Sequence, residues 1–266
     1  MTPDAGTIEL LYTKFMIGIL IFVRITGMFL MAPFYKSMAI PNQVKFFLAA
    51  IIAVSMTEAF WTQQATFDFH LWSLVIFVFK EFTVGAIIGF SANLVFHAAR
   101  MAGGIIDFEM GFQAASVFDP ANNNPTLVGE MKDLIALMIF LILNGHHQLI
   151  EVVFASIRAV PLTTFAFSEP TYILLIKFVT MIFILAIKIA APVLIALFST
   201  NLALALLARV APQTNIFIIS FQLKVAVGLL MLFISVPMLV YVIKWALGSM
   251  QEQTLQMIMT LYPPRV

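Results

Sequence analysis

Six long apolar runs limit what this chain can fold into more than any other feature. A helix needs about 20 apolar residues to cross a bilayer, and the first, third, fifth and sixth runs are long enough, whereas the second is short. In lipid, every backbone polar group must be bonded within the spanning structure, as it is in a helix. We therefore predict an all-α integral membrane-type protein with about six long, partly broken hydrophobic helices, at roughly 15–34, 44–60, 71–97, 133–157, 171–198 and 215–247.

Polar and proline residues interrupt three of these runs. Asn144 and Gly145, followed by two histidines, fall inside the fourth run and predict two half-helices around a polar turn. Pro192 interrupts the fifth run, and Pro237 is expected to kink the sixth. Serine, threonine or neighbouring helices must then satisfy the freed carbonyls.

The composition excludes several classes of protein. The chain is 62% hydrophobic and 10% charged, whereas soluble domains are about half apolar and about a quarter charged. A net charge of +1 gives no basic field for nucleic acid, and the absence of cysteine excludes disulfides, CxxC zinc sites and thiol nucleophiles. No GxSxG elbow, P-loop, GxGxxG or HExxH motif is present. We therefore expect no enzyme, no cofactor and no metal.

Charged residues inside the apolar runs are the first candidate functional group. Each would cost about 2.5–3.5 kcal/mol at the centre of a bilayer. Snorkelling near helix ends accounts for Lys177 and Lys224 but not for Arg24 or Lys188. Partners on other subunits, or helices that lie partly outside the bilayer, are the alternatives that we favour. The candidate inter-subunit contacts are Arg24, Lys80, Glu81 and Lys188.

The segment DFEMGFQAASVFDPANNNPT, residues 107–126, is the least helix-like part of the chain. Its Gly, Asp, Asn and Pro residues are typical of turns. Two of its residues, Phe112 and Phe118, are nevertheless large and apolar. Taken alone, the pattern fits an ordinary surface loop with buried phenylalanine anchors.

Four stretches of the chain resemble a known family. They are PFYKSMAIPNQVK from residue 33, MGFQAASVFDP from 110, LNGHHQLI from 143 and NLALALLARVAPQTNIFIISFQL from 201. Together they resemble the FliR family, the R subunits of the flagellar type III export gate, which has relatives in injectisomes. The likeness covers essentially the whole chain, although the double histidine at 146–147 is unusual against the single NGH of the family.

The resemblance also implies a division of the single domain 1–266. Residues 191–225 resemble the second half of the small Q subunit of the same gate. The family therefore looks like a P-type subunit joined to a Q-type subunit. On this basis we expect a P-like part at 1–190, a Q-like helical hairpin at 191–247 and a short tail at 248–266.

Partners and location follow from the resemblance as well. The family is expected to assemble with FliP and FliQ type subunits into a helical export-gate ring, which an FlhB type protein wraps and an FlhA type protein supplies with substrate. Unfolded flagellar proteins would pass through its centre. The resemblance therefore implies a multi-pass protein of the bacterial inner membrane, within the flagellar basal body, that binds no nucleic acid.

The family gives the irregular segment a role as a pore plug. Apolar side chains in a narrow lumen exclude water and ions, and the resemblance assigns this sealing to Met110, Phe112, Val117 and Phe118. Gly111 would supply flexibility, and Asp119 with Pro120 a fixed turn.

Two other classes of function compete with this interpretation. Broken helices and charges inside the membrane also fit a secondary transporter or channel for a small solute. However, the sequence has no paired interrupted segments in matching halves. A membrane-embedded enzyme would need a catalytic set that the sequence lacks.

Overall fold

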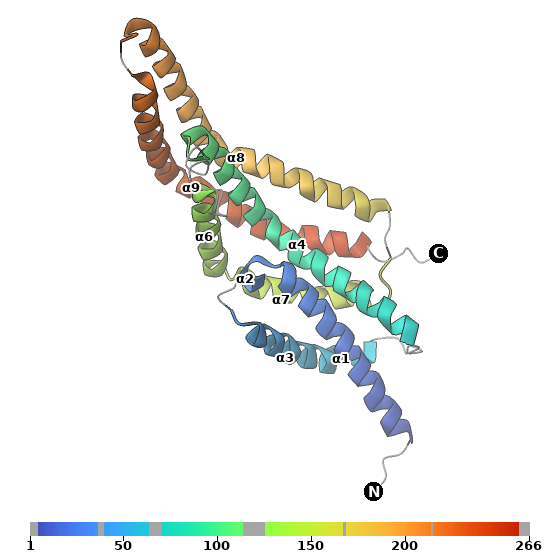
Figure 1. Ribbon diagram of the computed structural model, residues 1–266. Helices are drawn as coiled ribbons and strands as arrows, with labels where there is room; N and C mark the ends of the chain where they lie inside the picture. The colour runs from blue at the N-terminus through green and yellow to red at the C-terminus, as the bar shows by residue number, and fades with distance from the viewer. Residues whose placement is uncertain are drawn as a thin grey trace. The chain divides into compact units, whose positions relative to one another are not determined.

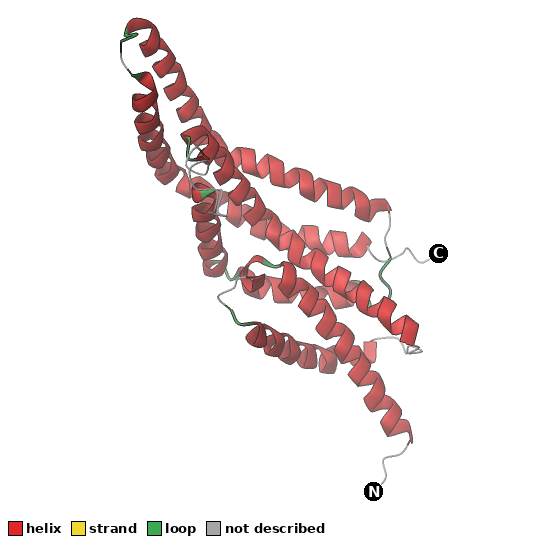
Figure 2. Cartoon of the chain, viewed as in Figure 1, coloured by secondary structure: helices red, strands yellow, loops and turns green. Residues whose placement is uncertain are grey.

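The computed structural model describes residues 5–36, 40–63, 71–113, 126–166, 169–213 and 215–260. All of its regular structure is helical, and these residues contain no strand (Figures 1 and 2). The prediction of an all-α protein is therefore confirmed. The helices are α1 (Ala5–Met31), α2 (Pro33–Lys36), α3 (Asn42–Phe60), η1 (Trp61–Gln63), α4 (Leu71–Met110), α6 (Leu127–Ile142), α7 (Gly145–Ala159), α8 (Glu169–Val210) and α9 (Ile216–Thr260).

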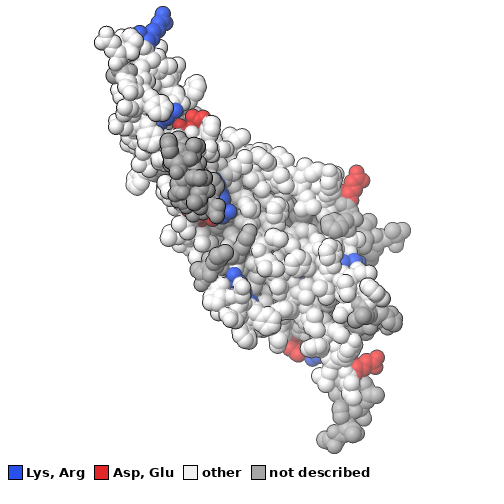
Figure 3. All heavy atoms as spheres, in the orientation of Figure 1, with Lys and Arg blue, Asp and Glu red and all other residues white. Residues whose placement is uncertain are grey.

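Five of the described helices are long and apolar enough to cross a membrane: α1, α3, α4, α8 and α9. The second apolar run, expected to be short, forms the 19-residue α3 and qualifies. The surface matches this character, because charged side chains are few on the face in Figure 3 and many large apolar side chains are exposed. The chain is a multi-pass membrane protein.

The fourth apolar run breaks at the position expected from the sequence. Helix α6 ends at Ile142 and α7 begins at Gly145. Between them Asn144 has φ 56° and ψ 31°, a left-handed conformation that asparagine tolerates better than most residues. At 16 and 15 residues, α6 and α7 are each shorter than the length needed to span a bilayer.

Both prolines lie inside helices that continue through them, Pro192 in α8 and Pro237 in α9. The proposed division between residues 190 and 191 falls inside α8, so it corresponds to no break in that helix. It remains a prediction, as does the separate tail, whose first residues belong to α9.

The chain forms two compact units. The first unit comprises Met1–Asn93, Asn144–Lys177 and Gly248–Val266, and the second comprises Leu94–Leu143 and Phe178–Leu247. Helices α4, α8 and α9 contribute residues to both.

In the first unit, α1 and α4 approach backbone to backbone. A Cβ atom added to Gly27 would lie 2.5 Å from the carbonyl oxygen of Phe82, and one added to Gly89 would lie 2.5 Å from that of Met28. Gly85 lies against the backbone of Arg24. Small residues permit such close crossings in membrane proteins. Next to this crossing α1 buries Leu20, Ile21 and Ile25, each at 0% exposure.

Candidate functional site: the base of the 107–126 segment and a buried ion pair

The irregular segment connects the end of α4 to the start of α6, and these two helices pack antiparallel in the second unit. Arg100 of α4 forms an ion pair with Asp133 of α6. Phe96 packs edge-to-face on Phe140 with 5.6 Å between ring centroids. As residue numbers rise along α4, those of the partners on α6 fall. Both ends of the segment therefore meet at one place.

Two glycines allow this approach. Gly103 of α4 lies so close to the backbone of Gly129 on α6 that no side chain fits between them. Gly129 is also hemmed in by Thr126, because an added Cβ atom would lie 2.5 Å from the Thr126 hydroxyl oxygen. The α4–α6 contact is therefore a direct contact of two backbones.

Asp107 closes the base of the segment. Its carboxylate accepts the backbone N–H of Val128, with both oxygens 3.1 Å from the nitrogen. The N-cap residue of α6, Thr126, makes no side-chain capping bond of its own. A carboxylate from α4 thus satisfies one of the free N–H groups at the start of α6, a role usually filled by the N-cap residue itself.

The end of α4 is also sharply defined. Phe112 N–H donates to the carbonyl of Asp107 at 3.0 Å, and Gly111 N–H donates to that of Phe108 at 3.1 Å. Gly111 has φ 85°, so the two bonds and the left-handed glycine form a Schellman motif. The structure thus shows Gly111 ending the helix, whereas its expected contribution to loop flexibility remains a prediction.

The start of the segment rests on α9. Met110 is fully buried, and a Cβ atom added to Gly228 would lie 2.6 Å from its sulfur. A Cβ atom added to Gly111 would lie 3.7 Å from the ring of Phe221. Phe112 is half-buried. Of the remaining candidate plug residues, Val117, Phe118, Asp119 and Pro120 lie outside the described residues.

The first unit holds a second polar cluster, around a fully buried ion pair. Arg24 Nε of α1 lies 2.6 Å from Glu81 Oε2 of α4, and both side chains are 0% exposed. The guanidinium also donates to Ser156 Oγ at 3.2 Å and to the carbonyl of Val160 at 3.3 Å. The buried guanidinium thus has hydrogen-bond acceptors on α4, on α7 and in the turn after α7, all far from Arg24 in the sequence.

The same cluster fixes the turn between α7 and α8. The other carboxylate oxygen of Glu81 accepts the backbone N–H of Thr163 at 2.8 Å, and Lys80 Nζ donates to the carbonyl of Thr163 at 3.1 Å. Thr163 has φ 70°, an unfavourable conformation for a β-branched residue. Two side chains from α4 thus bind both backbone polar groups of Thr163, the residue with the unfavourable φ.

Three of the four charged residues singled out from the sequence therefore meet within this chain: Arg24, Lys80 and Glu81. Lys188 lies exposed on α8 in the second unit. Sequence reasoning did not foresee that Arg24 and Glu81 bind each other, because 57 residues separate them. Their contact with other subunits remains a prediction.

Sequence reasoning also missed Lys132 and the carboxylate that caps α6. Lys132 of α6 is only 2% exposed, and no hydrogen bond or ion pair joins it to another described residue. Burial lowers the pKa of its amine from 10.5 to about 8. The sequence does place Asp107, an acidic residue, directly before a turn-rich segment. Its spacing from Val128 does not reveal that the two residues meet.

Comparisons with known proteins point to one family. Residues 15–250 match the family model described as bacterial export proteins, family 1. Flagellar biosynthetic protein FliR of Bacillus subtilis is 31% identical over 234 residues, which cover 85% of this chain and 88% of the relative. FliR of Escherichia coli is 30% identical over 220 residues, covering 82% of this chain and 83% of the relative.

A relative outside the flagellar proteins extends the match. The surface presentation of antigens protein SpaR of Shigella flexneri is 27% identical over 218 residues, covering 80% of this chain and 82% of the relative. The resemblance inferred from the quoted motifs is thereby confirmed. This chain belongs to the FliR family of bacterial export proteins.

Proposed function

We propose that this chain is a non-enzymatic subunit of the flagellar type III protein export gate. With FliP and FliQ type subunits it forms the channel through which unfolded flagellar proteins cross the inner membrane. FlhB and FlhA type proteins are its further partners in the basal body. Membership in the family of bacterial export proteins and the five apolar helices support this role.

The observation that carries the proposal is the fixed base of the 107–126 segment. A plug must change its position or conformation, whereas the helix ends that anchor it must stay fixed. The Schellman motif at Gly111 and the bond from Val128 to Asp107 anchor the two ends of the segment. The Gly103–Gly129 contact leaves no room for these ends to slide past each other.

The chemistry of the segment suits a seal. Met110, Phe112, Val117 and Phe118 would form an apolar constriction that excludes water and ions. Asp119 and Pro120 would hold a turn within it. Met110 already packs against α9, in the part of the chain that resembles a Q-type subunit. We infer that the plug closes against its own Q-like hairpin as well as against neighbouring subunits.

Exposed apolar side chains on α8 and α9 support assembly with other subunits. In the second unit Phe198, Leu202 and Phe217 are 69%, 56% and 85% exposed. Such surfaces are covered by lipid or by protein. The exposed amine of Lys188 on α8 provides a charged contact that lipid tails would not satisfy.

The assembly is tested by co-purification. The tagged chain is co-expressed with its FliP and FliQ type neighbours, and the mass of the complex is measured in mild detergent. A large complex with several FliP and FliQ copies per chain is expected. Lys188→Met should weaken recovery of these subunits, whereas Lys244→Met, which changes another exposed lysine, should not. A compact monomer or homodimer would contradict the proposal.

The plug is tested by ion leak. Phe112→Ala and a Val117→Ala/Phe118→Ala variant should raise the conductance of cells that contain the gate in the absence of export. Phe15→Ala, which removes a ring that is 65% exposed on α1, is the matched control. Loop variants that assemble normally and conduct no more than the control would overturn the plug assignment.

A further inference from the structure

A cavity in the first unit lies where two candidate membrane spans end together. Helices α1 and α3 form an antiparallel hairpin, because Lys14 pairs with Glu58 and Phe22 packs on Phe46 at 5.2 Å between ring centroids. The spans Ile8–Met31 and Asn42–Phe60 therefore share one end, at the connection through α2. The cavity, of about 600 Å³, opens at this shared end.

The cavity lies close to the ends of both candidate spans. Its lining runs from Thr26 to Leu30 on α1 and from Asn42 to Ala49 on α3. At about 1.5 Å per residue, this lining lies within about 10 Å of the ends of both spans. In a bilayer crossed by these two candidate spans, lipid headgroups and the first carbons of their acyl chains would occupy this level.

The floor of the cavity is aromatic and apolar. Phe29 and Tyr35 stack with 4.0 Å between ring centroids and 17° between ring planes, and each is 4% exposed. Leu30 and Phe46 form outer walls and are more than half exposed. Burial raises the pKa of the Tyr35 hydroxyl, so it stays neutral and introduces no negative charge.

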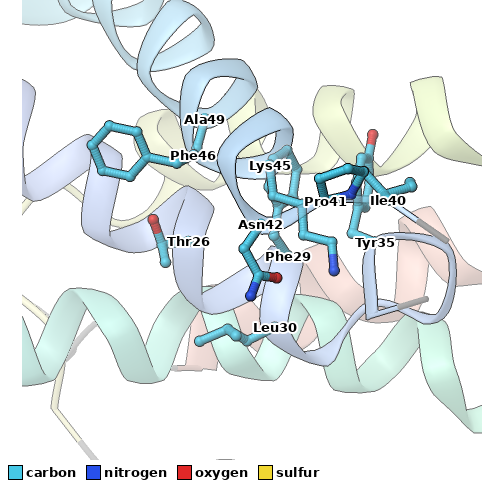
Figure 4. A pocket seen from close by; sticks show the side chains of 10 residues that line it. All are labelled: Thr26, Phe29, Leu30, Tyr35, Ile40, Pro41, Asn42, Lys45, Phe46 and Ala49. Carbon is cyan, nitrogen blue, oxygen red and sulfur yellow. The ribbon is translucent and has the colours of Figure 1, made fainter. Parts of the chain in front are cut away.

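The polar part of the lining carries positive charge only. Figure 4 shows the amine of Lys45 and the amide of Asn42 extending from the start of α3 toward the same side. The sequence from Ala32 to Ala49 contains Lys36 and Lys45 and no acidic residue. The ligand that complements this end of the hairpin is therefore an anion with an apolar body.

We propose that this cavity binds an anionic glycerophospholipid of the bilayer. One acyl chain lies on the Phe29–Tyr35 floor between Leu30 and Phe46, and the phosphate lies against Lys45 and Asn42. Basic pockets at the ends of transmembrane helices bind anionic headgroups in this way. At the opposite end of the hairpin the charge is mixed, because Lys14 lies beside the carboxylate of Glu58.

Native mass spectrometry of the full chain, with the subunits that it retains in mild detergent, tests the proposal. Phosphatidylglycerol or phosphatidylcholine is added at matched concentrations to wild type, Lys45→Gln, Lys45→Arg and the control Lys244→Gln. The Lys45→Gln variant should lose about five-fold in bound phosphatidylglycerol, the effect of one lysine beside an anionic headgroup. Lys45→Arg and Lys244→Gln should keep it, and phosphatidylcholine binding should not change. Equal binding of phosphatidylglycerol to all four proteins would overturn the proposal.

Photo-cross-linking separates lipid from a protein occupant. A benzophenone amino acid replaces Phe46, on the cavity wall, or Phe198, an exposed residue of α8 in the second unit. After irradiation of membranes that contain the assembled protein, position 46 should gain the mass of one phospholipid. A cross-link from position 46 to another polypeptide would show that a partner fills the cavity and overturn the lipid proposal. Reaction at position 198 but not at 46 would also overturn it.

Discussion

Asp107 on α4 accepts the backbone N–H of Val128 on α6, with both carboxylate oxygens 3.1 Å from the nitrogen. This bond crosses the base of the segment that we assign to the plug. It fixes where the segment leaves α4 and where the chain enters α6. A plug on such a base can change its own conformation while its anchor keeps its place.

Removing this bond should loosen the anchor. Asp107→Ala leaves the start of α6 without its side-chain acceptor, which costs about 1–2 kcal/mol for a lost cap. We expect a fall of a few degrees in the apparent melting temperature of the purified complex and a higher ion leak in cells. Glu109→Ala, which changes an acid on the same turn, is the control. Equal melting temperatures and equal leak in the two variants would show that Asp107 does not hold the loop.

The glycine contact beside it should tolerate no side chain. A Cβ atom on Gly103 would collide with the backbone of Gly129, and two helices would have to move apart. Overpacking of this kind costs about 1–3 kcal/mol or more. Gly103→Ala should therefore lower the yield of folded complex, as measured by size-exclusion chromatography after expression at equal levels. Gly248→Ala is the matched control, because nothing lies within 4 Å of its added Cβ atom. A Gly103→Ala complex recovered as fully as the control would contradict the close packing.

Local pattern predicted most of the fold. The apolar runs located every long helix among the described residues, and Asn144 and Gly145 located the break between α6 and α7. Helix ends were less visible, because α4 continues to Met110 through His97 and Arg100, beyond the apolar run that ends near 97. Small residues and the ion pair with Asp133 permit that extension, and neither is apparent from hydropathy.

Contacts between distant segments could not be predicted. Glycines 27, 85 and 89 set the crossing of α1 and α4, but their spacing does not reveal which helix they face. The cost of an isolated charge in lipid drew attention to Arg24 and Lys188. Only the fold distinguishes the two, because it places Glu81 beside Arg24 and leaves Lys188 exposed.

Breaking the buried pair should be more harmful than removing it. Arg24→Met leaves Glu81 buried and charged without its cation, which costs about 3–5 kcal/mol, whereas replacing both partners by apolar residues is often close to neutral. We expect little folded protein from Arg24→Met and a partial recovery in Arg24→Met/Glu81→Met. The turn at Thr163 still loses the acceptor supplied by Glu81, so recovery should be incomplete.

An exposed pair provides the comparison for this experiment. Lys14 and Glu58 form an ion pair in the same unit, and the Glu58 side chain is 67% exposed. Pairs of this kind contribute about 0–1 kcal/mol. Glu58→Gln should therefore leave the yield and melting temperature nearly unchanged. If the double variant were no better than Arg24→Met, the ion pair would not be the reason for the loss.

Lys132 should make stability depend on pH. Burial lowers its pKa in the folded chain from 10.5 to about 8, so the unfolded chain binds more protons between these pH values. Stability should therefore rise with pH across this window, and the cost of the buried cation is fully present below about pH 8. At about 1.4 kcal/mol per pKa unit, this cost is about 3 kcal/mol.

Replacing Lys132 by methionine removes this titration while keeping an unbranched side chain. Lys132→Met should be more stable than wild type near neutral pH, and the difference should shrink as the pH approaches 10.5, the ordinary lysine pKa. Melting temperatures of the detergent-purified complex, measured at closely spaced pH values, provide the test. Lys244→Met, at an exposed lysine, should follow the wild-type curve. A stability difference between Lys132→Met and wild type that stays constant over the whole window would mean that the amine does not titrate there, and that a group of opposite charge holds it protonated.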